Sequence, residues 1–96
     1  MKLESQIETS TGANLLKWAL QKSTRLLYLK FTSPGRNGVP DRMVLVEGKV
    51  IFIEFKRPGE KPTKLQDYMH RQLREMGFTV LVKDTNDIGD IVCLIE

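Results

Sequence analysis

Residues 41–56 read DRMVLVEGKVIFIEFK, and this stretch decides the fold. Two runs rich in β-branched and aromatic residues, 42–46 and 50–55, flank the dipeptide Glu47-Gly48. The pattern predicts two antiparallel strands joined by a two-residue turn, because Gly tolerates the backbone conformation that tight hairpin turns require. Both faces of this hairpin are apolar, so we expect it to lie in the interior of a sheet.

The turn also determines which residues of the hairpin face one another. With this two-residue turn, Asp41 comes to face Glu54 across the strand pair. Opposed residues point to the same side, so the two carboxylates are expected within about 5 Å at Cβ, on the face that Lys56 shares. A slip of one residue in the pairing would move the carboxylates to opposite faces.

Two like charges facing each other inside a sheet destabilise it unless a cation lies nearby. Lys56 could offset one charge, and a divalent metal ion could bind both, because Mg²⁺ prefers oxygen ligands that include carboxylates. The simpler interpretation is that Asp41 starts a strand or pairs with Arg42, and that Glu54 and Lys56 form an ion pair. The convergence of all three side chains beside a Gly- and Pro-rich loop favours a functional site.

The remaining segments predict helices and strands around this hairpin. A first helix has an apolar face and ends near Ser23, and Ser5 with Glu8 is a candidate capping box at its start. Gly12 weakens the middle of that helix. Segments 27–31 and 78–82 have strand character, and residues 32–40 form a loop with two Gly and two Pro.

The second half of the chain predicts two more helices. An apolar residue recurs every three or four positions after Thr63, which is a plausible N-cap, and Gly77 is a plausible stop. The spacing of the last apolar residues favours a short final helix over a strand. The predicted order is α-β-β-β-α-β-α, which is an α/β fold with a mixed sheet flanked by helices. The apolar positions are Leu65, Met69, Leu73 and Met76 in the first of these helices and Ile88, Ile91, Val92 and Ile95 in the second.

Length and composition limit the classes of function. The chain has 96 residues, 15 Lys and Arg, 12 Asp and Glu, and a formal net charge of +3. These values indicate one domain over residues 1–96, favour an anionic partner and exclude a binder that works by bulk charge alone. A single Cys and a single His exclude an internal disulfide and a Cys- or His-rich zinc site, so a metal would need oxygen ligands.

No run of apolar residues is long enough to cross a membrane, and residues 1–4 lack the apolar stretch of a secretory signal. We therefore expect a protein without a membrane partner that works in a reducing cytoplasm.

The spacing of the acidic residues resembles a known nuclease motif. Asp41, then twelve residues, then Glu54-Phe55-Lys56 is similar to the core of the PD-(D/E)XK nuclease superfamily. The segment Gly38-Val39-Pro40-Asp41 and the later Leu65-Gln66 resemble the VRR-Nuc family within it, and the short chain resembles its minimal stand-alone members from bacteriophages. The resemblance implies a restriction-endonuclease-like core.

The resemblance also implies roles for individual residues. Asp41 and Glu54, with the backbone carbonyl of Phe55, would hold one or two Mg²⁺ or Mn²⁺ ions, and Lys56 would orient a water and stabilise the transition state. Gln66 would lie beside the lysine, where it could orient the lysine or a water. Glu8 would complete the metal site, and its alternative role is the capping box with Ser5.

Basic residues near the motif are candidates for contact with DNA phosphates, which adds affinity without sequence preference. They are Arg36 in the loop and Arg57, Lys61 and Lys64 after the second hairpin strand. His70 is interpreted as a partly exposed helix residue.

The resemblance implies a metal-dependent, structure-selective endonuclease acting on branched or double-stranded DNA. A homodimer that resolves Holliday junctions is the favoured form, because a two-fold axis presents two sites to two similar strands. In a phage-encoded protein the location would be the host cytoplasm. The alternatives are a flap or nicking nuclease and a non-catalytic nucleic-acid-binding module.

Overall fold

The computed structural model describes residues 3–96, in which three helices cover a four-stranded sheet. The observed order is the predicted one, α-β-β-β-α-β-α, so the fold class is confirmed. Within residues 3–96 no helix has the length and apolar character needed to cross a bilayer. The elements are α1 (Glu4–Gln21), β1 (Leu26–Lys30), β2 (Arg42–Val46), β3 (Lys49–Phe55), α2 (Lys64–Glu75), β4 (Thr79–Lys83) and α3 (Gly89–Ile95).

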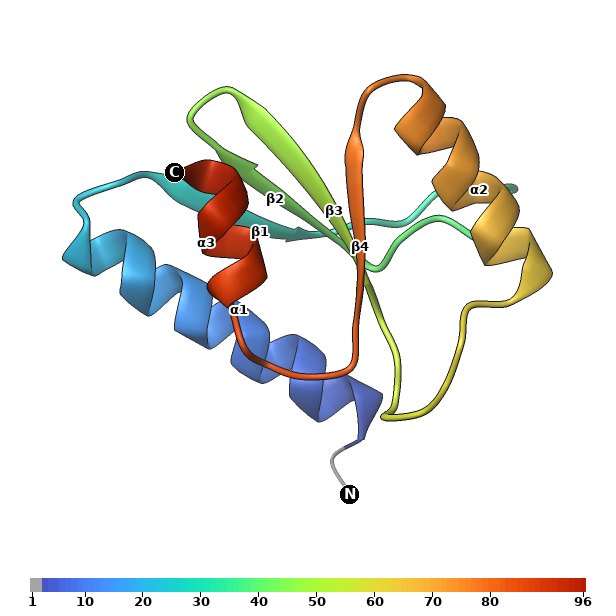
Figure 1. The fold of residues 1–96 in the computed structure, drawn as a ribbon, viewed down its shortest axis with the longest axis horizontal. Helices are drawn as coiled ribbons and strands as arrows, with labels where there is room; N and C mark the ends of the chain where they lie inside the picture. The colour runs from blue at the N-terminus through green and yellow to red at the C-terminus, as the bar shows by residue number, and fades with distance from the viewer. Residues whose placement is uncertain (1–2) are drawn as a thin grey trace.

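The sheet is mixed, with the spatial order β1-β2-β3-β4 (Figure 1). The pairs β1–β2 and β2–β3 are antiparallel, whereas β3 and β4 run parallel. The parallel pair requires a crossover connection, which α2 provides. The β2–β3 hairpin occupies the two central positions, as its two apolar faces predicted.

The hairpin turn has the predicted geometry. Glu47 and Gly48 adopt φ values of 49° and 75°, so both central residues of the turn lie in the left-handed region. The strands pair with Val46 opposite Lys49 and Arg42 opposite Ile53. This is the register that brings Asp41 and Glu54 to the same end of the hairpin.

The two faces of the sheet are covered by different helices. Figure 1 shows α1 and α3 together on one face and α2 on the other. The core between the sheet, α1 and α3 consists of apolar side chains, and each Val, Leu, Ile or Phe among them contributes about 1.5–3 kcal/mol when fully buried. Its buried members are Ile7, Leu15, Ala19, Leu26, Val44, Val46, Ile51, Ile53, Phe55, Ile91 and Ile95.

Helix α1 continues through Gly12, where the sequence predicted a weak middle. A Cβ atom at Gly12 would lie 2.5 Å from Cε2 of Tyr28, so glycine allows α1 to approach β1 closely. The Tyr28 hydroxyl donates a hydrogen bond of 2.7 Å to the backbone oxygen of Glu8 in the same helix. Gly12 therefore lowers the helix propensity of α1 but allows the close packing that fixes α1 on the sheet.

The sequence predicts the ends of α2 correctly and the start of α1 incorrectly. The Thr63 hydroxyl accepts from the Gln66 amide, and Gly77 follows α2 with φ 95°, so the predicted start and stop of α2 are confirmed. The capping box of Ser5 and Glu8 is wrong. Helix α1 begins one residue before Ser5, and the Leu3 amide donates to Oε1 of Gln6 at 3.0 Å.

Candidate active site

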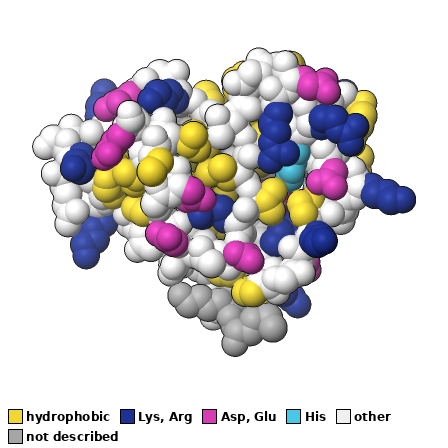
Figure 2. All heavy atoms as spheres, in the orientation of Figure 1, with side chains coloured by type: hydrophobic (Ala, Val, Ile, Leu, Met, Phe, Trp, Pro, Cys, Tyr) yellow, Lys and Arg dark blue, Asp and Glu magenta, His cyan; other side chains and the backbone are white. Residues whose placement is uncertain are grey.

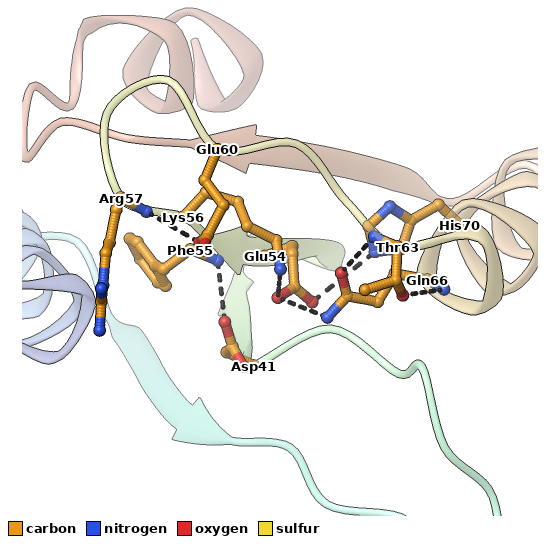
Figure 3. A network of polar contacts seen from close by, with 9 residues as sticks. All are labelled: Asp41, Glu54, Phe55, Lys56, Arg57, Glu60, Thr63, Gln66 and His70. Carbon is orange, nitrogen blue, oxygen red and sulfur yellow. Dashed lines mark hydrogen bonds and ion pairs between the residues drawn. The ribbon is translucent and has the colours of Figure 1, made fainter.

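Asp41 lies at the end of the loop, one residue before β2, and hydrogen bonds join it to Phe55 on β3 and to Phe31 directly after β1. Its Oδ2 atom accepts a hydrogen bond of 2.8 Å from the Phe55 amide on β3, and its backbone oxygen accepts one of 2.9 Å from the Phe31 amide. The carboxylate is thus placed across the hairpin next to Glu54, the residue before Phe55. Figure 3 shows this arrangement from close by.

Among the described residues, one group of acidic side chains lies close enough to share a cation. Glu4, Asp41 and Glu54 each offer a carboxylate oxygen, and these oxygens lie within 4.8 Å of one another. Glu54 is 1% exposed, and the other two are half-buried. The structure therefore adds Glu4, from the first turn of α1, to the two carboxylates that the hairpin brings together.

Glu8, which the resemblance assigned to the metal site, is engaged elsewhere. Its Oε2 atom forms an ion pair with Nε of Arg42 and lies 3.6 Å from Nζ of Lys30. The Arg42 guanidinium in turn lies 4.7 Å above the Tyr28 ring. Glu8 and Arg42 therefore join α1 to the sheet one helical turn away from Glu4. Glu4 and Glu8 are four residues apart and lie on one side of the helix, so the sequence alone does not show which of them reaches Asp41 and Glu54.

The surroundings of the acidic group disfavour the ionised form of its carboxyl groups. Burial, followed by the neighbouring Asp41 carboxylate, raises the pKa of Glu54 to about 8, although Lys56 opposes the shift. Burial and then Asp41 also raise the pKa of Glu4. Both shifts show that ionised carboxylates here lack sufficient positive charge around them.

The three residues fit a hard divalent cation. Carboxylate oxygens are ligands that Mg²⁺ and Mn²⁺ prefer, and a cation between them would offset their repulsion. In addition, Oε1 of Glu54 is buried and has no hydrogen-bond partner. A buried carboxylate oxygen without a hydrogen-bond partner is unusual in a native protein. A bound cation that keeps the carboxylate ionised would explain part of this arrangement.

Lys56 follows Glu54 by two residues at the end of β3, and its side chain is 9% exposed. Its Nζ atom lies 3.5 Å from Oε2 of Glu54, and its amide donates to the backbone oxygen of Lys83 on β4. The sequence pattern placed this lysine on the same face as Glu54. The structure confirms that placement and gives the acidic group one buried cation.

Gln66 contacts the same oxygen of Glu54 that Lys56 contacts. Its Nε2 atom donates to Oε2 of Glu54 at 3.3 Å, and its Oε1 atom accepts from the Thr63 amide at 2.9 Å. The loop before β2 supports this first turn of α2, because a Cβ atom at Gly38 would lie 2.8 Å from the Leu65 backbone oxygen. The close approach of loop and helix thus holds Gln66 against the acidic group.

His70 is the residue that sequence reasoning misplaced. It was expected to be partly exposed, but it is 0% exposed, and its Nε2 atom lies 3.7 Å from Oε1 of Glu54. Burial lowers the pKa of His70, which favours the neutral imidazole. The available signal was its position four residues after Gln66, which puts both side chains on one side of α2.

The four basic candidates all lie on the surface. Arg57 and Lys61 belong to the connection between β3 and α2, Lys64 begins α2, and Arg36 lies in the loop before β2. Within residues 3–96 none of the four forms an ion pair. Figure 2 shows several Lys and Arg side chains over α2, on the right of the view, and Figure 3 shows Arg57 on the other side of Phe55 from Gln66.

Comparisons with known proteins were made at the levels of sequence and structure. No protein-family model matches the chain. The protein named "Putative nuclease p44" from Acyrthosiphon pisum secondary endosymbiont phage 1 is 53% identical over 64 residues, which are 66% of this chain and 69% of the phage protein. A solved VRR_NUC domain matches with a TM-score of 0.77 and 24% identity, over 95% of this chain and 94% of the other.

The two similarities support different statements. The identity to the phage protein covers more than two thirds of that protein and shows common ancestry, whereas the structural match shows a shared fold. The chain therefore belongs to one family with this phage protein named a putative nuclease, and it has the fold of the VRR_NUC domain that its motif resembles.

Proposed function

We propose that this chain is a divalent-metal-dependent DNA endonuclease that hydrolyses phosphodiester bonds. The observation that carries the proposal is the convergence of Glu4, Asp41 and Glu54 beside the buried Lys56. Three carboxylates this close together, one of them fully buried, repel one another when ionised, and a bound cation would offset that repulsion. The phage relative carries the name "Putative nuclease p44", which supports the same activity.

Mg²⁺ or Mn²⁺ would be held by Glu4, Asp41 and Glu54, and when bound it would neutralise charge on the scissile phosphate and lower the pKa of a water. The carbonyl oxygen of Phe55 is a further proposed ligand. Its amide points to Asp41, and in an extended strand the amide and carbonyl of one residue point the same way. This ligand set replaces Glu8 by Glu4.

Lys56 would act on the attacking water and on the phosphate. Its ammonium group is buried beside Glu54, where a charge acts more strongly than in water. We propose that it orients the water and stabilises negative charge as the new P–O bond forms. The water gives up one proton to the solvent as it attacks, the P–O bond to the sugar oxygen breaks, and that oxygen takes up one proton from the solvent as it leaves. Gln66, held by Thr63, would keep the Glu54 carboxylate in position through its own hydrogen bond.

The DNA backbone would be held by exposed cations. Arg36, Arg57, Lys61 and Lys64 are proposed phosphate contacts, and such contacts position DNA without reading its sequence. The described helices contain no obvious set of side chains for reading base edges. We therefore propose selection of DNA by its shape.

The proposed substrate is a four-way junction, and the proposed assembly is a homodimer. Residues 1–96 would form one nuclease domain with one active site, so two cuts in two strands need two copies. A flap or a nicked duplex is the nearest alternative substrate, since a monomer could cut it. The dimer is tested by light scattering, which should give twice the 11.0 kDa mass of the chain.

The activity is tested by incubating the protein with a four-way junction, a flap and a linear duplex in Mg²⁺, Mn²⁺ or EDTA. Asp41→Asn and Lys56→Ala are the test variants, and we expect each to reduce cleavage by at least about 100-fold. Glu75→Gln and Lys22→Ala change exposed residues outside the site, at the ends of α2 and α1, and serve as matched controls.

Cleavage of the junction in Mg²⁺ that is lost in EDTA and in both test variants would support the proposal. Equal inactivity of the wild type and all variants on every substrate would refute it and would favour a non-catalytic binding module. Cleavage of the flap alone by a monomer would refute only the junction and dimer part.

A further inference from the structure

His70 is a buried polar residue beside the acidic group, and the proposed mechanism gives it no role. It lies on α2 one turn after Gln66, and both side chains point to Glu54 on β3. In Figure 3 the two carboxylate oxygens of Glu54 diverge, one towards His70 and the other towards Lys56 and Gln66. Helix α2 thus presents one side chain to each oxygen.

The two oxygens differ in their partners. Oε2 has Gln66 at 3.3 Å and Lys56 at 3.5 Å, whereas the Nε2 atom of His70 lies 3.7 Å from Oε1. Within the described residues, Oε1 of Glu54 and both ring nitrogens of His70 are buried without a hydrogen-bond partner. Leaving such groups unpaired is costly, and a small rotation of either side chain would join Nε2 to Oε1.

A neutral imidazole suits this position. It has one donor and one acceptor nitrogen, so the tautomer with a proton on Nε2 donates to a carboxylate and adds no charge. Ligating carboxylates are commonly held by hydrogen bonds of this kind, which determine the orientation of the ligand oxygens. His70 lies on the protein side of Glu54 and is fully buried, so it cannot itself contact DNA.

We propose that His70 is a positioning residue that holds Oε1 of Glu54 from α2 and thereby fixes the orientation in which this carboxylate meets the metal ion. This inference rests on the proposed function, because Glu54 must be a metal ligand. It predicts that removal of the Nε2 donor weakens metal binding even in the absence of DNA.

The test compares two amides at position 70 by titrating the protein with Mn²⁺ in a calorimeter. The nitrogen of the Gln side chain lies as many bonds from Cα as Nε2 of His, and that of Asn lies one bond closer. We expect His70→Gln to bind Mn²⁺ within about threefold of wild type, and His70→Asn to bind it about 10- to 100-fold more weakly. His70→Leu, which has no donor, should weaken binding like the Asn variant.

Met69→Leu is the matched control, because Met69 is the buried neighbour of His70 on α2 and takes no part in the site. Equal Mn²⁺ affinity in the wild type and in both the Asn and Leu variants would overturn the inference, and so would equal weakening in the Gln and Asn variants. If the wild type cuts DNA and binds Mn²⁺, these results leave the proposed function intact. A wild type that neither cuts DNA nor binds Mn²⁺ would overturn both.

Discussion

Asp41 and Phe55 are joined across the β2–β3 hairpin by a hydrogen bond of 2.8 Å from the Phe55 amide to the Asp41 carboxylate. The same carboxylate belongs to the acidic group with Glu4 and Glu54. Asp41 therefore has a structural contact and a proposed ligand role in one side chain. The two roles can be separated, because an amide can accept the hydrogen bond but is a poor substitute for a charged ligand.

Asp41→Asn and Asp41→Ala should therefore differ in stability but agree in metal binding. The Asn variant keeps an acceptor for the Phe55 amide, whereas the Ala variant leaves it unpaired, at a cost of about 1–3 kcal/mol. Urea unfolding in EDTA measures the free energies, and Mn²⁺ titration should show that both variants bind the metal weakly. Equal stability of the two variants would mean that the hydrogen bond contributes nothing.

The stability of the metal-free protein should depend on pH through Glu54. Burial, and then Asp41, raises its pKa from 4.5 to about 8, so the native state binds this proton more tightly than the unfolded state. The stability that the proton provides is fully present below about pH 4.5 and is lost as the pH rises to about 8. We expect the free energy of unfolding in EDTA to fall over this interval, and to fall less in Glu54→Gln.

Thermal or urea unfolding at several pH values in EDTA provides the measurement, with wild type and Glu54→Gln side by side. Excess Mg²⁺ should remove most of the difference, because a bound cation favours the ionised carboxylate. A wild-type slope no steeper than that of the Gln variant would indicate that Glu54 is ionised at neutral pH without metal.

The hairpin could be predicted from the sequence because its determinants are local. The two-residue turn at Glu47 and Gly48 sets the register, and the period of two sets the faces. Once the register and the faces of the strands are known, counting residues along the two strands shows that Asp41 and Glu54 lie opposite each other. The limits of α2 were also predictable, since Thr63 and the left-handed Gly77 act on the adjacent backbone.

The contacts made by α1 and α2 with the sheet could not be predicted in the same way. Whether Glu4 or Glu8 reaches the acidic group depends on how far α1 extends past the sheet, and both lie on one side of the helix. His70 looked like a surface residue because its burial depends on where α2 crosses β3. Gly12 looked unfavourable because its benefit is a contact with Tyr28, sixteen positions away.

Glu4 and Glu8 should behave oppositely when each is changed to Gln. Glu4→Gln should weaken Mn²⁺ binding about tenfold or more and leave the metal-free stability unchanged or slightly higher, because it removes repulsion. Glu8→Gln should leave Mn²⁺ binding nearly unchanged and lower stability by about 1–3 kcal/mol, because it leaves the partly buried Arg42 without its charged partner.

Calorimetry and urea unfolding on the same two preparations check both parts of this expectation. The double variant Glu8→Gln with Arg42→Gln should recover part of the lost stability if the ion pair causes it. If Glu8→Gln weakened Mn²⁺ binding and Glu4→Gln did not, the family assignment of Glu8 would stand and Glu4 would leave the proposed site.

DNA binding should depend on salt through the exposed cations next to the site. Each of Arg57, Lys61 and Lys64, when changed to Gln, should reduce the slope of log affinity against log salt by about 0.9, because one phosphate contact is lost. Lys22→Gln is the control, since Lys22 is exposed at the far end of α1 from Glu4. Binding is measured in EDTA, so that the DNA is not cut, with a four-way junction and a duplex of equal length. If the control reduces the slope of log affinity against log salt as much as the three test variants do, DNA binding responds to net charge alone. If only the test variants reduce this slope, the DNA backbone contacts the connection between β3 and α2.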